Sequence, residues 1–141
     1  MNFLVDTCVI SELGKKEPNP NVISWIRSCP EEKLFLSSLT FGELQKGVSK
    51  LGPSNKKNEL QYWINIKLLN RFAGRIIPID STVTQKWGQV QAKAEQMGKP
   101  MPALDGLIAA TALTHNLTVL TRNVQDMTSS GAEIVNPWVT V

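Results

Sequence analysis

The sequence predicts a three-layer α/β sandwich built on a mostly parallel β-sheet. Short apolar runs alternate with longer segments of helical periodicity, and parallel strands need such helical crossover connections. With 141 residues, of which 42% are hydrophobic, the chain is long enough for one sizeable core and too short for two ordinary domains. No repeat, low-complexity tract or interdomain linker interrupts it. Residues 1–141 are therefore expected to form a single domain.

The first half of the chain carries the signals of two strands and three helices. In order, we expect a buried strand over 3–5, a helix over 8–14, a helix over 20–30, a buried strand over 34–37 and a helix over 40–52. Pro20 and Pro30 mark the ends of the second helix, because proline is tolerated in a first turn and cannot continue a helix. The Thr40-x-x-Glu43 spacing is that of a capping box, which would start the third helix at Thr40.

The second half continues the alternation. Residues 56–72 separate apolar from basic positions at helical spacing, which predicts an amphipathic helix. Pro78 places the following strand at an edge or an end of the sheet. The remaining expected elements are a strand over 75–79, a helix over 80–98 that Asp80 can cap, a buried helix over 103–115, a strand over 118–121 and a short strand over 133–135.

Charge and composition limit the function classes. The chain has 15 Lys and Arg against 12 Asp and Glu, a net charge of +3 that suits a polyanionic partner without demonstrating one. No apolar run approaches the roughly 20 residues that span a bilayer, and the N-terminus lacks the pattern of a secretory signal. We therefore expect a cytoplasmic protein with no membrane role. Cys8 and Cys29 form no CxxC pair and no cluster with histidine, so neither a disulfide nor a zinc site is indicated.

Functional groups of a parallel sheet usually lie beyond the carboxyl ends of its strands, and three carboxylates are expected at that edge. Asp6 ends the first strand, Glu43 lies early in the helix after the second, and Asp105 lies early in the helix before the 118–121 strand. Like charges held close together repel unless they are protonated or neutralised by a cation. Mg²⁺ prefers hard oxygen ligands, keeps several waters and supports phosphodiester cleavage. The three acids therefore predict a magnesium site.

Each acid also has a purely structural interpretation. Glu43 could belong to the capping box, Asp105 could complement the dipole of a helix N-terminus, and Asp6 could be an Asx turn or an N-cap. Their joint placement favours the metal site, because three independent caps need not lie at one end of one sheet.

Four segments resemble the motifs of VapC-type PIN domains and occur in that family's order. They are residues 4–13 (LVDTCVISEL), 37–47 (SSLTFGELQKG), 102–112 (PALDGLIAATA) and 121–127 (TRNVQDM), followed by a closing 134–138 (IVNPW). A single motif would be weak, but the ordered set is specific and covers nearly the whole chain. The resemblance implies a PIN-like fold.

The resemblance also implies roles for individual residues. Asp6, Glu43 and Asp105 would be the acidic metal-binding and catalytic set for Mg²⁺, or Mn²⁺ in its place, with Asp6 and Asp105 as the most direct ligands. Thr7 or Ser11 would orient Asp6 or a bound water.

Other positions support this site or depart from the family pattern. Thr121 is a supporting residue, and Arg122 either contacts a phosphate or makes a structural ion pair. Position 8 is Cys where family members often have Asn. Asn123 stands where many PIN domains have a fourth acid, and an amide ligates through its carbonyl or through water without adding charge, so a second metal would be held less tightly. Asp126 either substitutes for that acid or caps the following turn.

The activity that the resemblance implies is that of a metal-dependent endoribonuclease, the toxin of a VapBC-type toxin–antitoxin pair, which cleaves RNA and inhibits translation. Transfer RNA is the family-level expectation for the substrate. The implied partners are a second copy of the chain, giving a homodimer, and a VapB-like antitoxin that lays a helix or extended segment across a groove of the early helices. DNA would be contacted only through the antitoxin.

Three alternatives remain for comparison. A degenerate PIN domain that only binds RNA or protein would be favoured by loss of a core acid, yet all three acids are present. A phosphotransferase of the haloacid-dehalogenase type uses a second aspartate two positions after the first, where this chain has Cys8. A receiver domain needs adjacent early acids and a late lysine, which are not evident.

Overall fold

One all-parallel sheet organises the molecule. In the computed structural model, which describes residues 1–139, five strands are ordered β3-β2-β1-β4-β5. They are β1 (Phe3–Val5), β2 (Leu34–Ser37), β3 (Ile76–Ile77), β4 (Thr118–Leu120) and β5 (Ile134–Val135). The central strand, β1, pairs with β2 on one side and β4 on the other. The predicted fold class is confirmed, as is the edge position of the strand next to Pro78.

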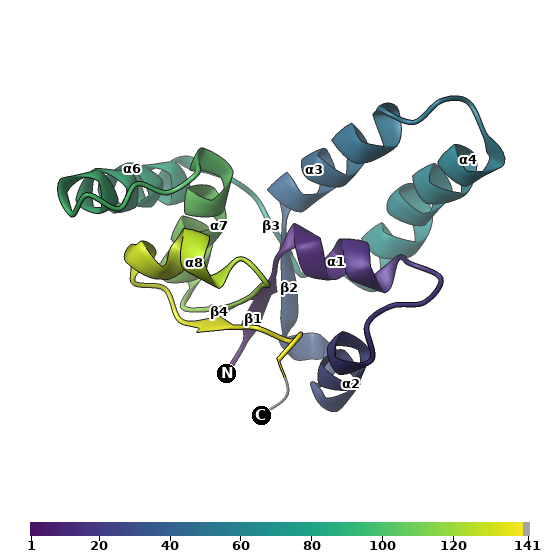
Figure 1. Ribbon diagram of the computed structural model, residues 1–141, viewed down its shortest axis with the longest axis horizontal. Coiled ribbons are helices and arrows are strands. Elements are labelled where there is room, and N and C mark those ends of the chain that lie inside the picture. Colours follow the sequence, from purple (N-terminus) through teal and green to yellow (C-terminus); the bar gives the residue numbers. More distant parts are fainter. Residues whose placement is uncertain (140–141) are drawn as a thin grey trace.

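Helices cover both faces of this sheet. They are α1 (Thr7–Leu13), α2 (Pro20–Ser28), α3 (Ser38–Ser49), α4 (Asn55–Tyr62), α5 (Leu69–Arg71), α6 (Ser81–Gln96), α7 (Ala103–His115) and α8 (Val124–Met127). Figure 1 shows α6, α7 and α8 on one side of the sheet and α1, α2, α3 and α4 on the other. The three layers are therefore helix, sheet and helix. Within residues 1–139, no helix is both long and apolar enough to cross a bilayer.

The side chains of β1 alternate between two cores. Phe3 and Val5 pack in the cluster that contains Val9 of α1, whereas Leu4 packs in the cluster that contains Ile108 of α7. The alternation follows from the pleat of a strand, in which successive side chains point to opposite faces. Burial on both faces also explains why the strands read as continuous apolar runs rather than alternating ones.

The start of α3 differs from the predicted one. The helix begins at Ser38, because the Ser37 hydroxyl at the end of β2 accepts a hydrogen bond from the Leu39 N–H at 3.1 Å and caps the helix. Thr40 lies inside the first turn and is fully buried. The capping box predicted for Thr40 and Glu43 is therefore wrong, and both side chains are available for other contacts.

The predicted helix over 56–72 is continuous but not uniform. α4 passes at Trp63 into a π-helical segment, Trp63–Leu68, and α5 completes the helix. Segments of this kind occur frequently at functional sites. The following helix, α6, starts as predicted, since Asp80 accepts the Val83 N–H at 3.0 Å.

Candidate functional site

Asp6 lies at the carboxyl end of β1, directly before α1. Only 4% of its surface is exposed. Its Oδ1 accepts a hydrogen bond from the Thr7 N–H at 2.8 Å, which confirms the N-cap interpretation, and its Oδ2 accepts one from the Thr121 hydroxyl at 2.8 Å. Burial raises the pKa of Asp6, and these hydrogen bonds to the charged form oppose the rise. The Asp6 carboxylate is thus held in one orientation and also caps the N-terminus of α1.

Strand pairing brings Thr121 to Asp6. Val5 of β1 pairs with Leu120 of β4, so the residues that follow the two strands lie side by side. Thr121 is fully buried, and its hydroxyl accepts the Asn123 N–H at 3.0 Å while it donates to Asp6. The expected supporting role of Thr121 therefore has a physical basis in the backbone that follows β4.

Cys8 faces the same carboxylate. Its Sγ lies 3.7 Å from Oδ2 of Asp6 and 3.4 Å from Oγ1 of Thr121. Burial raises the pKa of this thiol, and the charge of Asp6 raises it further. A protonated thiol is a weak hydrogen-bond donor to the carboxylate. The side-chain amide of an asparagine at this position would be a stronger donor to the same carboxylate.

Glu43 reaches the site from α3. Its Oε1 accepts a hydrogen bond from the Thr7 hydroxyl at 2.7 Å, and that hydroxyl also lies 3.1 Å from the hydroxyl of Thr40. Thr7 therefore holds Asp6 through its backbone and Glu43 through its side chain. Ser11, the other residue expected to orient Asp6, is exposed and lies along the groove described below.

Asp105 shares an electrostatic environment with the other acids. Partial burial raises its pKa, and the charges of Asp6, Asp126 and Glu43 raise it further, to about 6. The ion pairs of residues 1–139 lie elsewhere, between Lys15 and Glu12 and between two arginines and Glu31, so none neutralises these acids. Negative charge thus accumulates at one end of the sheet.

These acids fit a hard divalent cation in donor chemistry. Among residues 1–139, the structure shows no group of three or more His, Cys, Asp or Glu side chains placed to hold a metal ion together. Mg²⁺ does not require one, since it keeps several waters and is commonly held by one or two carboxylates together with substrate phosphates. The unneutralised charge around Asp105 is what such an ion would compensate.

The remaining expected residues have separate surroundings. Asp126 is exposed in α8, and its charge acts on Asp105. Asn123 is half-buried, and its described hydrogen bond is the one from its N–H to Thr121. The guanidinium carbon of Arg122 lies 4.9 Å from the centre of the Trp138 ring, and in the part of the chain that is described Arg122 makes no ion pair. Stacking on Trp138 was not predicted, because it joins residues from separate motifs.

A groove of about 980 Å³ lies between α1, α3 and α4, and Glu43 is one of the residues that line it. We call it the early-helix groove. Its apolar walls are formed by Leu44, Val48, Leu60, Trp63 and Ile64, and the lysines that line it are Lys15, Lys16 and Lys56.

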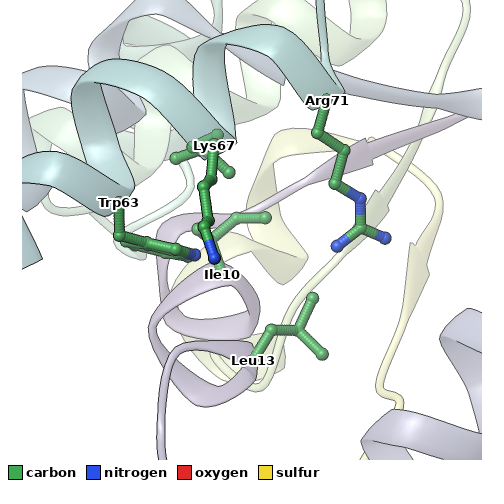
Figure 2. A pocket seen from close by; sticks show the side chains of 6 residues that line it. Ile10, Leu13, Trp63, Lys67 and Arg71 are labelled. Carbon is green, nitrogen blue, oxygen red and sulfur yellow. The ribbon is translucent and has the colours of Figure 1, made fainter.

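A smaller pocket of about 90 Å³ shares Trp63 with this groove. In Figure 2, Lys67 and Arg71 extend from the helical segment above toward α1, which contributes Ile10 and Leu13. Apolar walls next to basic side chains suit an amphipathic protein segment better than a bare nucleic acid chain.

The chain matches the family model described as PIN domain over residues 3–125. It is 41% identical over 136 residues to Toxin FitB of Neisseria gonorrhoeae, covering 96% of this chain and 98% of that protein. It is 36% identical over 136 residues to VapC ribonuclease Y4jK of Sinorhizobium fredii, covering 96% and 97%.

Solved structures agree with these matches. FitAB bound to an IR36 DNA fragment contains a chain with a TM-score of 0.93 and 38% identity, covering 99% of this chain and 97% of that one. VapBC2 from Rickettsia felis, bound to a DNA fragment from its promoter, gives a TM-score of 0.76 and 26% identity, covering 96% and 98%. The resemblance in the motifs is confirmed: the chain belongs to the PIN-domain family, within its VapC/FitB group of toxins.

Proposed function

We propose that this protein is a Mg²⁺-dependent endoribonuclease and the toxin of a toxin–antitoxin pair. The observation that carries the proposal is the accumulation of uncompensated carboxylates around Asp105, whose pKa is raised to about 6 by burial and by the charges of Asp6, Asp126 and Glu43. The relative from Sinorhizobium fredii is named a ribonuclease, which supports RNA as the substrate. Transfer RNA is the class to test first, on the strength of the family resemblance.

The side chains of the site divide into two roles in this proposal. Asp6 and Asp105 are the most direct metal ligands, and Glu43 completes the acidic set. Asp126 and Asn123 are weaker candidates for a second ion. When bound, Mg²⁺ would supply charge stabilisation during phosphodiester cleavage and a more acidic water.

The antitoxin is proposed to bind in the early-helix groove. Two relatives of known structure, FitAB and VapBC2 from Rickettsia felis, are described as bound to DNA fragments, and FitB of Neisseria gonorrhoeae is named a toxin, which supports a comparable partner here. The groove offers apolar walls around Leu60 and Trp63 and is also lined by Glu43, so a segment lying in it would contact one member of the acidic set. A homodimer and contact with DNA through the antitoxin belong to the same proposal, as does a cytoplasmic location.

The decisive experiment is RNA cleavage by the purified chain after removal of any copurified antitoxin. Cleavage is expected with Mg²⁺ or Mn²⁺ and lost in EDTA, and Asp6→Asn and Asp105→Asn should each abolish it together with growth inhibition in cells. The matched control is Asp80→Asn, which changes a helix-capping acid outside the acidic set. RNA binding without metal-dependent cleavage would instead support the degenerate binding module.

A further inference from the structure

Arg122 has an unoccupied guanidinium, unlike two other arginines of the chain. The guanidinium groups of Arg71 and Arg75 both bind Glu31, at 3.0 and 3.2 Å. Arg122 is exposed, and among residues 1–139 its side chain makes neither an ion pair nor a hydrogen bond. The N–H groups of its guanidinium are therefore available to a ligand.

The ring of Trp138 holds this guanidinium in place, with the guanidinium carbon 4.9 Å from the ring centre. Trp138 is itself anchored, because its side chain packs against the core cluster that contains Phe3. Its N–H donates to the side chain of Asn136 at 2.9 Å, and its carbonyl accepts from the side chain of Asn21 at 2.9 Å. Stacking fixes the plane of a guanidinium without using its N–H donors, so Arg122 would lose little conformational freedom on binding a ligand.

The backbone of Arg122 lies beside the acidic site. Thr121, directly before it, donates to Oδ2 of Asp6 at 2.8 Å, and Asn123, directly after it, donates its N–H to the Thr121 hydroxyl at 3.0 Å. These bonds hold Arg122 in a fixed turn at the end of β4, next to a proposed metal ligand.

A structural role toward Glu12 does not account for Arg122. The pKa of Glu12 is lowered first by the hydrogen bond from Lys15 at 2.9 Å and then by that from the Asn19 N–H at 2.8 Å, and the charge of Arg122 is the weakest of the named causes. The structure shows no ion pair between Arg122 and Glu12. The carboxylate of Glu12 therefore has its own partners without Arg122.

We propose that Arg122 binds a phosphate of the RNA substrate next to the scissile one, and that Trp138 is the residue that positions it. The inference rests on the proposed function, because it takes RNA as the substrate. A guanidinium matches the geometry of a phosphate with two parallel hydrogen bonds. A cation beside the acidic set would also reduce the repulsion between those acids and the incoming polyanion.

The test measures binding of fluorescently labelled bulk transfer RNA by anisotropy, in the Asp105→Asn background so that no cleavage is expected. Arg122→Gln should weaken binding about tenfold. It should also reduce the slope of log Kd against log salt concentration by about 0.7 to 0.9, the loss of one phosphate contact. Arg122→Lys keeps the charge but not the planar donors, so it should retain the slope and weaken binding about threefold.

Arg27→Gln is the matched control. Arg27 is exposed in the last turn of α2 and has no ion pair within residues 1–139. Its replacement removes the same charge at a distance from the acidic site and should change the affinity for transfer RNA less than about twofold, because separated surface charges are screened by salt.

A double-mutant cycle tests the role of Trp138. Trp138→Leu should weaken RNA binding about threefold in a protein that retains Arg122, and Trp138→Phe, which keeps a ring under the guanidinium, should restore most of the affinity. In the Arg122→Gln background, Trp138→Leu should cause no further loss. Thermal unfolding verifies that each variant is folded, and the pair Arg122→Gln and Trp138→Phe tests the proposal even where Trp138→Leu is unstable.

Cleavage kinetics distinguish a neighbouring phosphate from the reacting one. With Asp105 intact, Arg122→Gln should raise the KM for transfer RNA about tenfold, with little change in kcat and none in the Mg²⁺ concentration needed for half-maximal rate. A fall in kcat at unchanged KM would overturn the inference, because it would place Arg122 at the scissile phosphate.

Other results would also overturn it: an unchanged salt slope in Arg122→Gln, an equal loss in Arg27→Gln, or the same loss from Trp138→Leu with and without Arg122. Weaker antitoxin binding with unchanged RNA binding would assign Arg122 to the antitoxin instead. Failure of the proposed function is a separate result, seen as no metal-dependent cleavage by the wild-type protein. An Arg122-dependent salt slope would then describe the RNA contact of a binding module.

Discussion

The electrostatic repulsion within the acidic site is seen in the raised pKa of Asp105. Desolvation and three neighbouring acids raise its pKa to about 6, from an ordinary value of 3.8. A raised carboxyl pKa means that the folded protein binds the proton more tightly than the unfolded chain does. The destabilisation is therefore fully present above about pH 6 and disappears as the pH falls through the folded pKa toward the unfolded one.

Asp105→Asn is expected to stabilise the metal-free protein, because it removes that charge. The gain should be about 1 kcal/mol at pH 8, once solvent screening at a half-exposed carboxylate is allowed for. It should vanish near pH 4, where aspartate is largely protonated in both states. Urea unfolding of the two proteins in EDTA at both pH values provides the measurement. A gain independent of pH would show that charge is not its cause.

Thr121→Val tests the hydrogen bond that holds Asp6. The hydroxyl of Thr121 is the strongest of the contacts that oppose the rise in the pKa of Asp6, so its removal should raise that pKa further and lower stability at pH 7 by about 1–3 kcal/mol. The loss should shrink in acid, where the carboxyl is protonated. The matched control is Thr118→Val in β4, the strand that Thr121 follows, because the Thr118 hydroxyl donates to the Glu133 carboxylate at 3.3 Å, away from the site. Equal, pH-independent losses in both variants would contradict the prediction.

At the scale of elements, the sequence was most informative where apolar runs and capping residues act locally. The strands and the Asp80 cap follow directly from such signals. The start of α3 could not be predicted in this way, because Ser37 and Thr40 can both cap a helix. Which of them does so depends on where β2 ends. The π-helical segment from Trp63 was equally hidden, since its residues retain the apolar spacing of an ordinary helix.

Gly106 lies at a close contact between helices α6 and α7, which the amino-acid composition alone does not reveal. A Cβ at this position of α7 would clash with Oε1 of Gln91 and lie 3.2 Å from Nε1 of Trp87, both in α6. Neither side chain can move freely, because Gln91 donates to the Met101 carbonyl and Trp87 to the Ala103 carbonyl. Both bonds fix the segment that leads into α7 and hence the position of the acid that precedes Gly106.

Gly106→Ala should therefore lower the free energy of unfolding by about 1–3 kcal/mol through overpacking. Gly88→Ala is the matched control in the middle of α6, where nothing lies near the added methyl group, and it should stabilise by up to about 1 kcal/mol. Truncating the obstructing side chain, in Gly106→Ala/Gln91→Ala, should relieve the steric part of the loss. Urea unfolding measures all three variants, and a stabilising Gly106→Ala would mean that the two helices separate without cost.

At the scale of the whole molecule, the order of the strands in the sheet brings together residues that are far apart in the sequence. The central position of β1 brings Asp6 between the ends of β2 and β4, so that Thr121 reaches its carboxylate and Glu43 reaches the hydroxyl of the neighbouring Thr7. The candidate acids were proposed from their positions at the end of a strand, for Asp6, and early in helices, for Glu43 and Asp105. The walls of the early-helix groove could not be predicted in this way, because they come from three helices whose packing depends on the complete fold.

Leu60→Glu tests the groove as the binding surface of the antitoxin. Leu60 lines the groove from α4, whereas Tyr62 lies on the same helix, is 56% exposed and does not line it. Burying an unpaired carboxylate against an apolar segment should weaken binding by about 2 kcal/mol or more, roughly thirtyfold in Kd. The matched variant Tyr62→Glu should bind normally, and both should retain RNA cleavage as free proteins. Calorimetry with the cognate antitoxin measures the difference, and equal affinities for the two variants would place the antitoxin on another surface.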